Sequence, residues 1–251
     1  MEASSTLLSY ERKLTRNELA LVPTPQPTAT HRPVPHVEVV SSLVETLGFR
    51  HIGVHKEEYA VSKDAMKMFG LIELDQIFYG GHISTAGDST SYSCRFAIGI
   101  RNSHDKSMRL AMTVGYRVFV CENMAFQGDF QPVLAKHSKH FSLRNALSVG
   151  VDQMQRNFEP MVQAVSSWRE TQLSDVSAKL IIYRAFIECE LDVPKHYGRQ
   201  VHDTYFNPSI EEFQPRTMWS LSNSFTTVFK QLEPIPQYKA TAKLASFLER
   251  A

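Results

Sequence analysis

Four arginines alternate with small residues along two neighbouring segments of the chain. The arginines are Arg95, Arg101, Arg109 and Arg117, and the residues between them are Ala97, Gly99, Ala111, Thr113 and Gly115. Because side chains alternate along a strand, all of these residues are expected on one face of a hairpin. Like charges placed side by side destabilise a sheet unless an anion binds among them. The pattern therefore indicates a face that binds phosphate groups of nucleic acid, with small residues that let the backbone or a base approach closely.

The positive charge around this face is local. The whole chain has Lys+Arg 27 and Asp+Glu 26, a formal net charge of +1. Between residues 95 and 144, eight Lys and Arg residues stand against three Asp and Glu residues. We expect Lys106, Lys136 and Lys139 to extend the basic face into a track that binds single-stranded DNA. The alternative is an ordinary solvated surface, because an outer sheet face must be polar in any case.

A second group of residues has side chains that bind transition metals. The group consists of His104, Asp105, Cys121, His137 and His140. The spacing from Cys121 to the two later histidines is not an established zinc spacing. Asn102, Ser103 and Asp105 are of the types that bond their own backbone in turns. We therefore expect turn and helix-entry roles, assign no metal site, catalytic residue or cofactor, and keep a metal-dependent hydrolase or nuclease as an alternative function.

A third segment combines aromatic and basic side chains. It contains Lys195, His196, Tyr197, Arg199, His202, Tyr205 and Phe206, inside a connection expected to run from Asp192 to Pro215. Aromatic rings there could stack on unpaired bases, or they could pin the connection to the core. Trp219 and Phe225 stand at helical spacing and are expected in the core.

The elements that must position these residues are strands in the middle third of the chain. Alternating apolar residues predict strands over residues 92–101 and 110–120, joined by a polar turn over residues 102–107. Residues 51–61 and 67–74 are also predicted to be strands. One face of the hairpin is expected to be buried and the arginine face exposed.

Helices are predicted on both sides of the strands. Apolar spacing and Gly48 predict a short helix over residues 37–47, and a stripe from Leu143 to Trp168 predicts a long helix with a kink at Pro160. Further helices are predicted over residues 174–191, 217–232 and 238–250. The inner face of the helix that begins after Ser174 is expected to consist of Val176, Leu180, Ile181, Tyr183 and Ile187. The fold class is therefore α+β: an antiparallel sheet, with a central hairpin over about residues 92–121, packed against long C-terminal helices.

The chain is expected to divide into four parts. Residues 1–21 form an N-terminal arm, and the five prolines between Val22 and Pro35 predict an extended linker over residues 22–36. Residues 37–232 form a single α+β domain, and residues 233–251 a C-terminal helix. The arm or the sheet edges are expected to join copies into a homo-oligomer, and a non-catalytic oligomeric interaction protein is a third possible function.

Composition excludes several classes of protein. The 251 residues are 43% hydrophobic and 21% charged, as in globular domains. A membrane span and a secretory signal are not expected, because the chain has no stretch of about 18 apolar residues. Three cysteines, none in a Cys-x-x-Cys pair, predict a reducing cytoplasm and no disulfide framework. No glycine-rich phosphate loop is present.

Several segments resemble the phage/plasmid-like family known as domain of unknown function 932. The resemblance spans about residues 30–232, and its motif residues are Asn102, Ser103, His104, Asp105, Arg117 to Asn123 with Cys121, His140, and Trp219 to Asn223. Family members commonly have Gly where this chain has Lys106, and Thr where Phe141 or Ser142 falls. The family has no assigned activity. Its occurrence in phages and plasmids implies work on mobile genetic elements, in recombination, replication or defence, and adds weight to a DNA-binding function.

Overall fold

The structure is a computed structural model that describes residues 12–85, 90, 93–121, 123–126, 132–138, 141–232 and 234–251. Contacts divide the chain into two compact units. Unit 1 contains Met1–Gln76, Phe96–Gly115 and Phe130–Phe158. Unit 2 contains Ile77–Arg95, Tyr116–Asp129 and Glu159–Ala251. Three strands and the longest helix contribute residues to both units.

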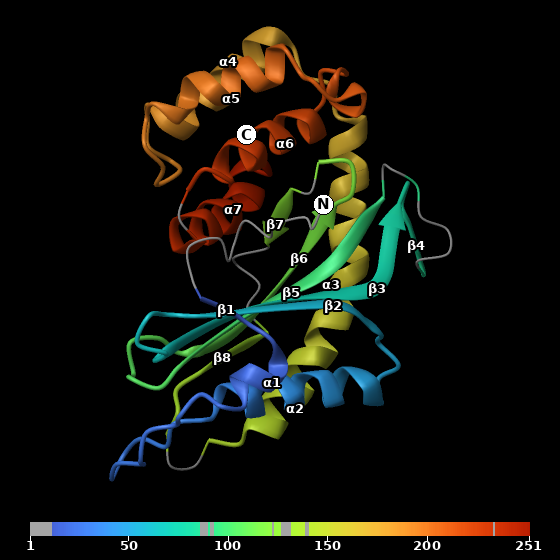
Figure 1. The fold of residues 1–251 in the computed structure, drawn as a ribbon. Helices are drawn as coiled ribbons and strands as arrows, with labels where there is room; N and C mark the ends of the chain where they lie inside the picture. Colours follow the sequence, from blue (N-terminus) through green and yellow to red (C-terminus); the bar gives the residue numbers. More distant parts are fainter. Residues whose placement is uncertain are drawn as a thin grey trace. The chain divides into compact units, whose positions relative to one another are not determined.

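The fold class is α+β, as predicted. The strands within the described residues are β1 (Arg12–Leu14), β2 (Val54–Val61), β3 (Lys67–Tyr79), β4 (His82–Thr85), β5 (Cys94–Ser103), β6 (Leu110–Val118), β7 (Met124–Phe126) and β8 (Val133–Ala135). They form one sheet in the order β1-β2-β3-β5-β6-β7, with β4 paired to β3 and β8 to β6 (Figure 1). The helices are α1 (Arg16–Leu19), α2 (His36–Phe49), α3 (Leu143–Glu170), α4 (Asp175–Phe186), α5 (Tyr197–Phe206), the short 3₁₀ helix η3 (Glu211–Phe213), α6 (Met218–Phe229) and α7 (Pro234–Leu248).

The hairpin of β5 and β6 forms where the alternating pattern predicts it, but the expected exposure of the arginine face is wrong. Ala97, Ala111 and Thr113 on that face are 0%, 3% and 3% exposed. Period-two alternation separates two faces without saying which one meets solvent. The small residues that were expected to admit a ligand instead leave room for close packing within the protein.

Helices α2 and α3 supply the apolar side chains that pack in unit 1. Val39, Leu43 and Leu47 of α2 follow helical spacing and are fully buried. Phe158 of α3 stacks on Phe96 of β5, with ring centroids 4.1 Å apart. Gly150 brings α3 close to the sheet, since a Cβ atom there would lie 2.4 Å from a side-chain carbon of Val133. Helix α3 therefore packs closely against strands β5 and β8.

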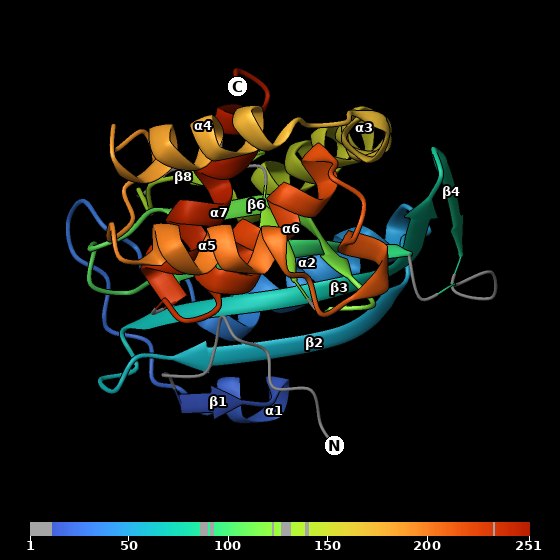
Figure 2. The same cartoon turned by 90° about the horizontal axis from the view of Figure 1, so that it is seen from above.

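Segments at the N-terminal end of the described chain dock on unit 1. Strand β1 pairs antiparallel with β2, placing Leu14 opposite Tyr59 (Figure 2). Helix α1 begins with a capping box between Thr15 and Glu18, and Arg16 forms an ion pair with Glu57 of β2. Residues 22–35 lack helix and extended strand, as the prolines predict, yet Val34 is 8% exposed. The Pro-rich segment is therefore held against the protein.

Four helices of unit 2 share one apolar core. Its members come from α4, α5, α6, α7 and the segments between them, with Phe186 stacked on Phe225 at 5.7 Å. The prediction of a long connection over residues 192–215 is wrong, because helices α5 and η3 lie within these residues. Val201 and Tyr205, four residues apart, anchor α5 in the core.

The predicted inner face of α4 is also wrong. Ala178, Ile181, Ile182, Ala185 and Phe186 are buried, whereas Val176, Leu180, Tyr183 and Ile187 are 76%, 56%, 50% and 47% exposed. Both faces of this helix carry apolar residues, so spacing alone does not identify the packed face.

Within the described part of the chain, no helix is long and apolar enough to cross a membrane.

Candidate anion-binding cleft

The turn between β5 and β6 is closed by its own side chains. Ser103 Oγ donates to the carbonyl of Met108 at 2.9 Å and accepts from its amide at 3.1 Å. Asp105 Oδ1 accepts from the amide and the hydroxyl of Ser107. These are the turn roles expected for this segment. Lys106 at the tip has φ 67°, the left-handed conformation that glycine adopts without strain. Lys106 thus takes a backbone conformation that favours glycine and places a cation at the tip of the turn.

Asn102 and His104 join this turn to the Pro-rich segment. The side-chain amide of Asn102 donates to the carbonyl of Val34 at 3.0 Å and to His36 Nδ1 at 2.9 Å. His104 Nε2 lies 3.0 Å from the same Val34 carbonyl. Asn102 is fully buried, so these hydrogen bonds are made in a low-dielectric environment. They fix where the Pro-rich segment lies beside the hairpin.

Four histidines are packed in two stacked pairs at this junction. The rings of His36 and His104 have centroids 3.8 Å apart, and those of His31 and His137 have centroids 5.7 Å apart. His137 also stacks on Phe141 at 6.0 Å. The exposed fractions of His31, His36, His104 and His137 are 8%, 1%, 3% and 5%. The sequence interpretation missed His31 and His36, although two histidines flanking prolines in an otherwise polar segment were a visible signal.

Burial keeps three of these histidines neutral. Burial, with a smaller effect of neighbouring histidines, lowers the pKa of His36 to about 4 and that of His137 to about 4. Burial also lowers the pKa of His104. Neutral His36 fits its contacts, since Nδ1 accepts from Asn102 and Nε2 donates to the carbonyl of Ala65.

His31 has a different environment, because both of its ring nitrogens face carbonyl oxygens. Nδ1 lies 3.0 Å from the carbonyl of His137, and Nε2 lies 3.1 Å from that of His104. A carbonyl oxygen only accepts hydrogen bonds, so a ring N–H of His31 donates to one of these two carbonyls. His31 therefore joins the turn after β5 to the segment that carries His137.

A cleft of about 470 Å³ opens beside this histidine cluster. Its lining residues are Thr30, His31, Lys106, Ser107, Met108, Arg109, Lys136, His137 and Ser138. Three of them are cations, and none of the described lining residues is acidic. Lys106, Arg109 and Lys136 are exposed, and none of the three has an ion-pair partner among the described residues. The nearby Asp105 carboxylate accepts hydrogen bonds within its own turn. We call this site the basic cleft.

The structure separates the seven cations expected to form one track. Lys106, Arg109 and Lys136 line the basic cleft, while Arg101 is a half-buried residue of β5 outside its lining. Arg95 is 6% exposed, and its guanidinium lies 5.2 Å from the ring centroid of Phe119. Arg95 and Arg117 belong to unit 2. Lys139 lies outside the described residues. Three of the six described cations therefore meet at one cleft in unit 1.

A second polar cluster lies in unit 2. The side-chain amide of Asn123 donates to the backbone carbonyl and the Oδ1 atom of Asn223, both at 3.1 Å, and to Thr227 Oγ1 at 3.0 Å. Cys121 Sγ lies 3.7 Å from Asn223 Oδ1, and Lys230 Nζ donates to the Cys121 carbonyl. Asn123 and Asn223 are 1% and 2% exposed. Their hydrogen bonds join the end of β6 and the start of β7 to α6.

The chain was compared with models of known protein families. The family described as Domain of unknown function (DUF932) matches residues 28–247. The chain belongs to this family. Neither the curated proteins nor the solved structures contain a match to it.

Several of the polar residues on which the expected resemblance to DUF932 rests fall into the two polar clusters. Asn102, Ser103, His104 and Asp105 build the turn beside the basic cleft, and Cys121, Asn123 and Asn223 join strands to α6 in unit 2. His140 lies outside the described residues. The side chains of Asn102, Ser103 and Asn123 hold backbone carbonyls in place.

The metal-binding alternative finds no support in the described part of this DUF932 chain. No group of three or more His, Cys, Asp or Glu side chains there could hold a metal ion. His104 and His137 lie together in unit 1, but Asp105 is engaged in its turn and Cys121 belongs to unit 2.

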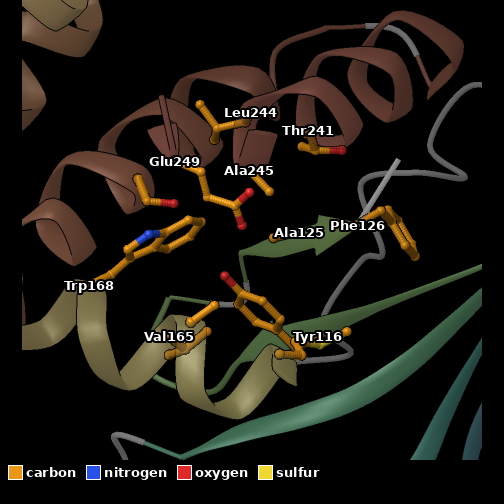
Figure 3. A pocket seen from close by; sticks show the side chains of 12 residues that line it. Tyr116, Ala125, Phe126, Val165, Trp168, Thr241, Leu244, Ala245 and Glu249 are labelled. Carbon is orange, nitrogen blue, oxygen red and sulfur yellow. The ribbon is translucent and has the colours of Figure 1, made fainter. Parts of the chain in front are cut away.

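A smaller cavity in unit 2 has the wrong size for a substrate. It measures about 20 Å³, and Figure 3 shows the Tyr116 hydroxyl, the Trp168 indole and the Glu249 carboxylate turned toward it. Such a volume has room for about one water molecule.

Two aromatic side chains of residues 195–206, Tyr205 and Phe206, pack within unit 2, whereas Lys195, His196 and Arg199 are exposed. The guanidinium of Arg216 lies 5.1 Å from the ring centroid of Tyr205 and 4.9 Å from that of Phe206. Tyr205 is 1% exposed. The two rings therefore pin α5 to its neighbours, which was one of the two roles expected for this segment.

Proposed function

We propose that the protein binds nucleic acid, and single-stranded DNA in particular, through phosphate groups held in the basic cleft. The observation that carries this proposal is the convergence of Lys106, Arg109 and Lys136 on one cleft without an acidic lining residue among those described. Cations that lack protein partners contribute their full charge to an incoming phosphate and release its condensed counterions. This local positive charge is the kind of surface that steers polyanions in a protein whose net charge is only +1.

The size of the cleft favours a single strand. A volume of about 470 Å³ lies within the range of ligand pockets that hold one small molecule or one to two nucleotide groups. A duplex presents phosphates on a wide cylinder, and its binding requires cations spread over a much larger surface. Thr30 and Ser138 also line the cleft, and their hydroxyls can donate to phosphate oxygens.

The proposal is tested by removing the charges of the cleft. The double variant Arg109→Gln/Lys136→Gln is expected to bind a single-stranded oligonucleotide at least about tenfold more weakly than the unchanged protein, measured by fluorescence anisotropy at about 50 mM salt. Arg144→Gln is the matched control. Its side chain is 85% exposed, lies in the same unit and is outside the cleft. Equal affinity of the double variant and the unchanged protein would contradict the proposal.

Within the proposal, the protein acts on the DNA of phages or plasmids, in the cytoplasm and as a homo-oligomer. Assembly through residues 1–21 or through the sheet edges is measured by light scattering of the full chain and of a chain that lacks residues 1–21. A shorter chain with an unchanged assembly state would exclude the N-terminal segment as the contact.

A further inference from the structure

His137 is a buried side chain without a hydrogen-bond partner. It is 5% exposed, and neither Nδ1 nor Nε2 has a partner among the described residues. Buried polar groups are almost always hydrogen-bonded, and an unmade hydrogen bond at such a site costs free energy. The same ring lines the basic cleft. The unpartnered nitrogens therefore indicate a ligand group that enters the cleft and accepts a hydrogen bond at its wall.

The surroundings of His137 select an anion as that group. Its ring stacks on those of His31 and Phe141, which hold it in place. Lys106, Arg109 and Lys136 supply the positive charge around it. Three positive charges around one small volume exceed what the single charge of an internal phosphodiester requires. They match a terminal phosphate better, because a phosphomonoester carries about two negative charges at neutral pH.

The distribution of the other arginines supports the same choice. A protein that follows a strand along its length needs a line of cations at successive phosphates. Arg95 is buried over Phe119, and Arg95 and Arg117 lie in unit 2. Lys106, Arg109 and Lys136 converge on one cleft and thus form a cluster instead of a line.

We propose that the basic cleft recognises the terminal phosphomonoester of a nucleic-acid strand, with His137 donating a hydrogen bond to the phosphate and Lys106, Arg109 and Lys136 neutralising its charge. This inference rests on the proposed function and specifies the part of the strand that the cleft takes. A strand with a hydroxyl end makes the weaker, purely electrostatic contact.

The test compares oligonucleotides of one sequence that differ only at their ends. A strand with a 5′-phosphate, a strand with a 3′-phosphate and a strand with two hydroxyl ends are titrated by fluorescence anisotropy. One of the phosphorylated strands is expected to bind about 10- to 100-fold more tightly than the hydroxyl strand, the gain from a hydrogen bond to a charged group. Equal affinity for all three strands overturns this inference and leaves the proposed function intact, whereas no binding of any strand overturns both.

Free phosphates distinguish a strand end from a small ligand. Inorganic phosphate and a nucleoside monophosphate are added as competitors against the phosphorylated strand. Competition only at concentrations far above the strand's dissociation constant is the expected result. If either competitor binds as tightly as the strand, the cleft is a site for a free phosphate compound and the inference is wrong.

His137→Phe tests the role of the imidazole. Phenylalanine keeps the stacking with His31 and Phe141 and removes two unpartnered buried nitrogens, so the fold is expected to stay stable. The variant should lose the preference for the phosphorylated end and keep the salt-sensitive binding of the hydroxyl strand, while Arg144→Gln keeps both. A retained preference would overturn the role of His137. In the unchanged protein, the imidazole NMR signals of His137 should shift with the phosphorylated strand and not with the hydroxyl strand, a readout that does not depend on the folding of any variant.

Discussion

The imidazole rings of His36 and His104 stack with their centroids 3.8 Å apart and 6° between their planes. His36 is the first residue of α2, and His104 directly follows the last residue of β5. The stack therefore joins two segments that are far apart in the sequence. Asn102 donates to His36, and His104 contacts the carbonyl of Val34, to which Asn102 also donates. The Pro-rich segment is therefore part of the wall of the basic cleft and not a free linker.

Stability is expected to fall as the pH is lowered from 7 to about 4. The pKa of His36 is lowered from 6.5 to about 4 in the folded protein, chiefly by burial. Between these values the unfolded chain binds a proton at His36 that the folded chain does not, so the free energy of unfolding decreases by up to about 1.4 kcal/mol per pH unit from this residue. Urea denaturation at several pH values measures the slope.

The variant His36→Gln measures how much His36 contributes to the pH dependence of the free energy of unfolding. The rest of the chain is the same in both proteins, so the difference between the two slopes reports on His36 together with its coupling to His104 and His137. The variant is expected to have a shallower dependence on pH between 6.5 and 4. Identical slopes in the two proteins would show that His36 is protonated equally in the folded and unfolded states.

Lys106→Gly is expected to separate folding from binding. Lys106 adopts φ 67°, where a side chain costs about 1 kcal/mol that glycine avoids. Because glycine also has more freedom in the unfolded chain, the free energy of unfolding should stay unchanged or rise by up to about 1 kcal/mol. Oligonucleotide binding should weaken with the loss of the charge. Lys106→Ala is the matched variant that loses the charge and keeps the strain, and a Lys106→Gly protein clearly less stable than Lys106→Ala would exclude this explanation.

Arg169→Met is expected to destabilise unit 2 by about 3 to 5 kcal/mol. Arg169 Nη1 lies 2.6 Å from Glu212 Oε1, and its guanidinium carbon lies 4.4 Å from the ring centroid of Trp219. The Glu212 side chain is only 6% exposed, so it would become an uncompensated buried charge. The double variant Arg169→Met/Glu212→Gln should recover part of the loss, because glutamine still accepts from the Trp219 indole. Thermal unfolding measures both, and a double variant less stable than Arg169→Met would contradict the role of the charge.

Asn123→Ala is expected to lower the free energy of unfolding by about 1 to 3 kcal/mol without changing oligonucleotide binding. The Asn123 side-chain amide donates to the carbonyl and Oδ1 of Asn223 and to the hydroxyl of Thr227, all in unit 2. Denaturation and anisotropy measured on the same preparation check the two effects. A folded variant that no longer binds DNA would show that this motif residue contributes to the binding site.

The hairpin, α2 and α3 were predictable because each has a long, regular pattern. Period-two alternation identifies β5 and β6, and apolar steps of three and four identify α3 despite Pro160. Helix α5 was missed because its core contacts rest on few apolar residues, such as Val201 and Tyr205, within a polar segment. The packed face of α4 was misassigned because tertiary contacts, and not spacing, choose between two apolar faces.

The candidate site was only partly predictable for a related reason. Lys106, Arg109 and Lys136 were expected to act together, and the structure brings them to one cleft. Arg95 was grouped with them because strand alternation gives the face of a residue but not its surroundings. His31 lies 106 positions before the carbonyl of His137 that it contacts, and no local pattern reveals such a pairing.

The dependence of binding on salt tests the central claim most directly. For three phosphate contacts, raising the salt concentration from about 50 to about 200 mM should weaken the binding of a single-stranded oligonucleotide about 20-fold, measured by fluorescence anisotropy. The variant Arg109→Gln/Lys136→Gln should lose most of this dependence. Affinity that is absent at the lower salt concentration, or that does not change between the two, would contradict a basic cleft that binds phosphate groups.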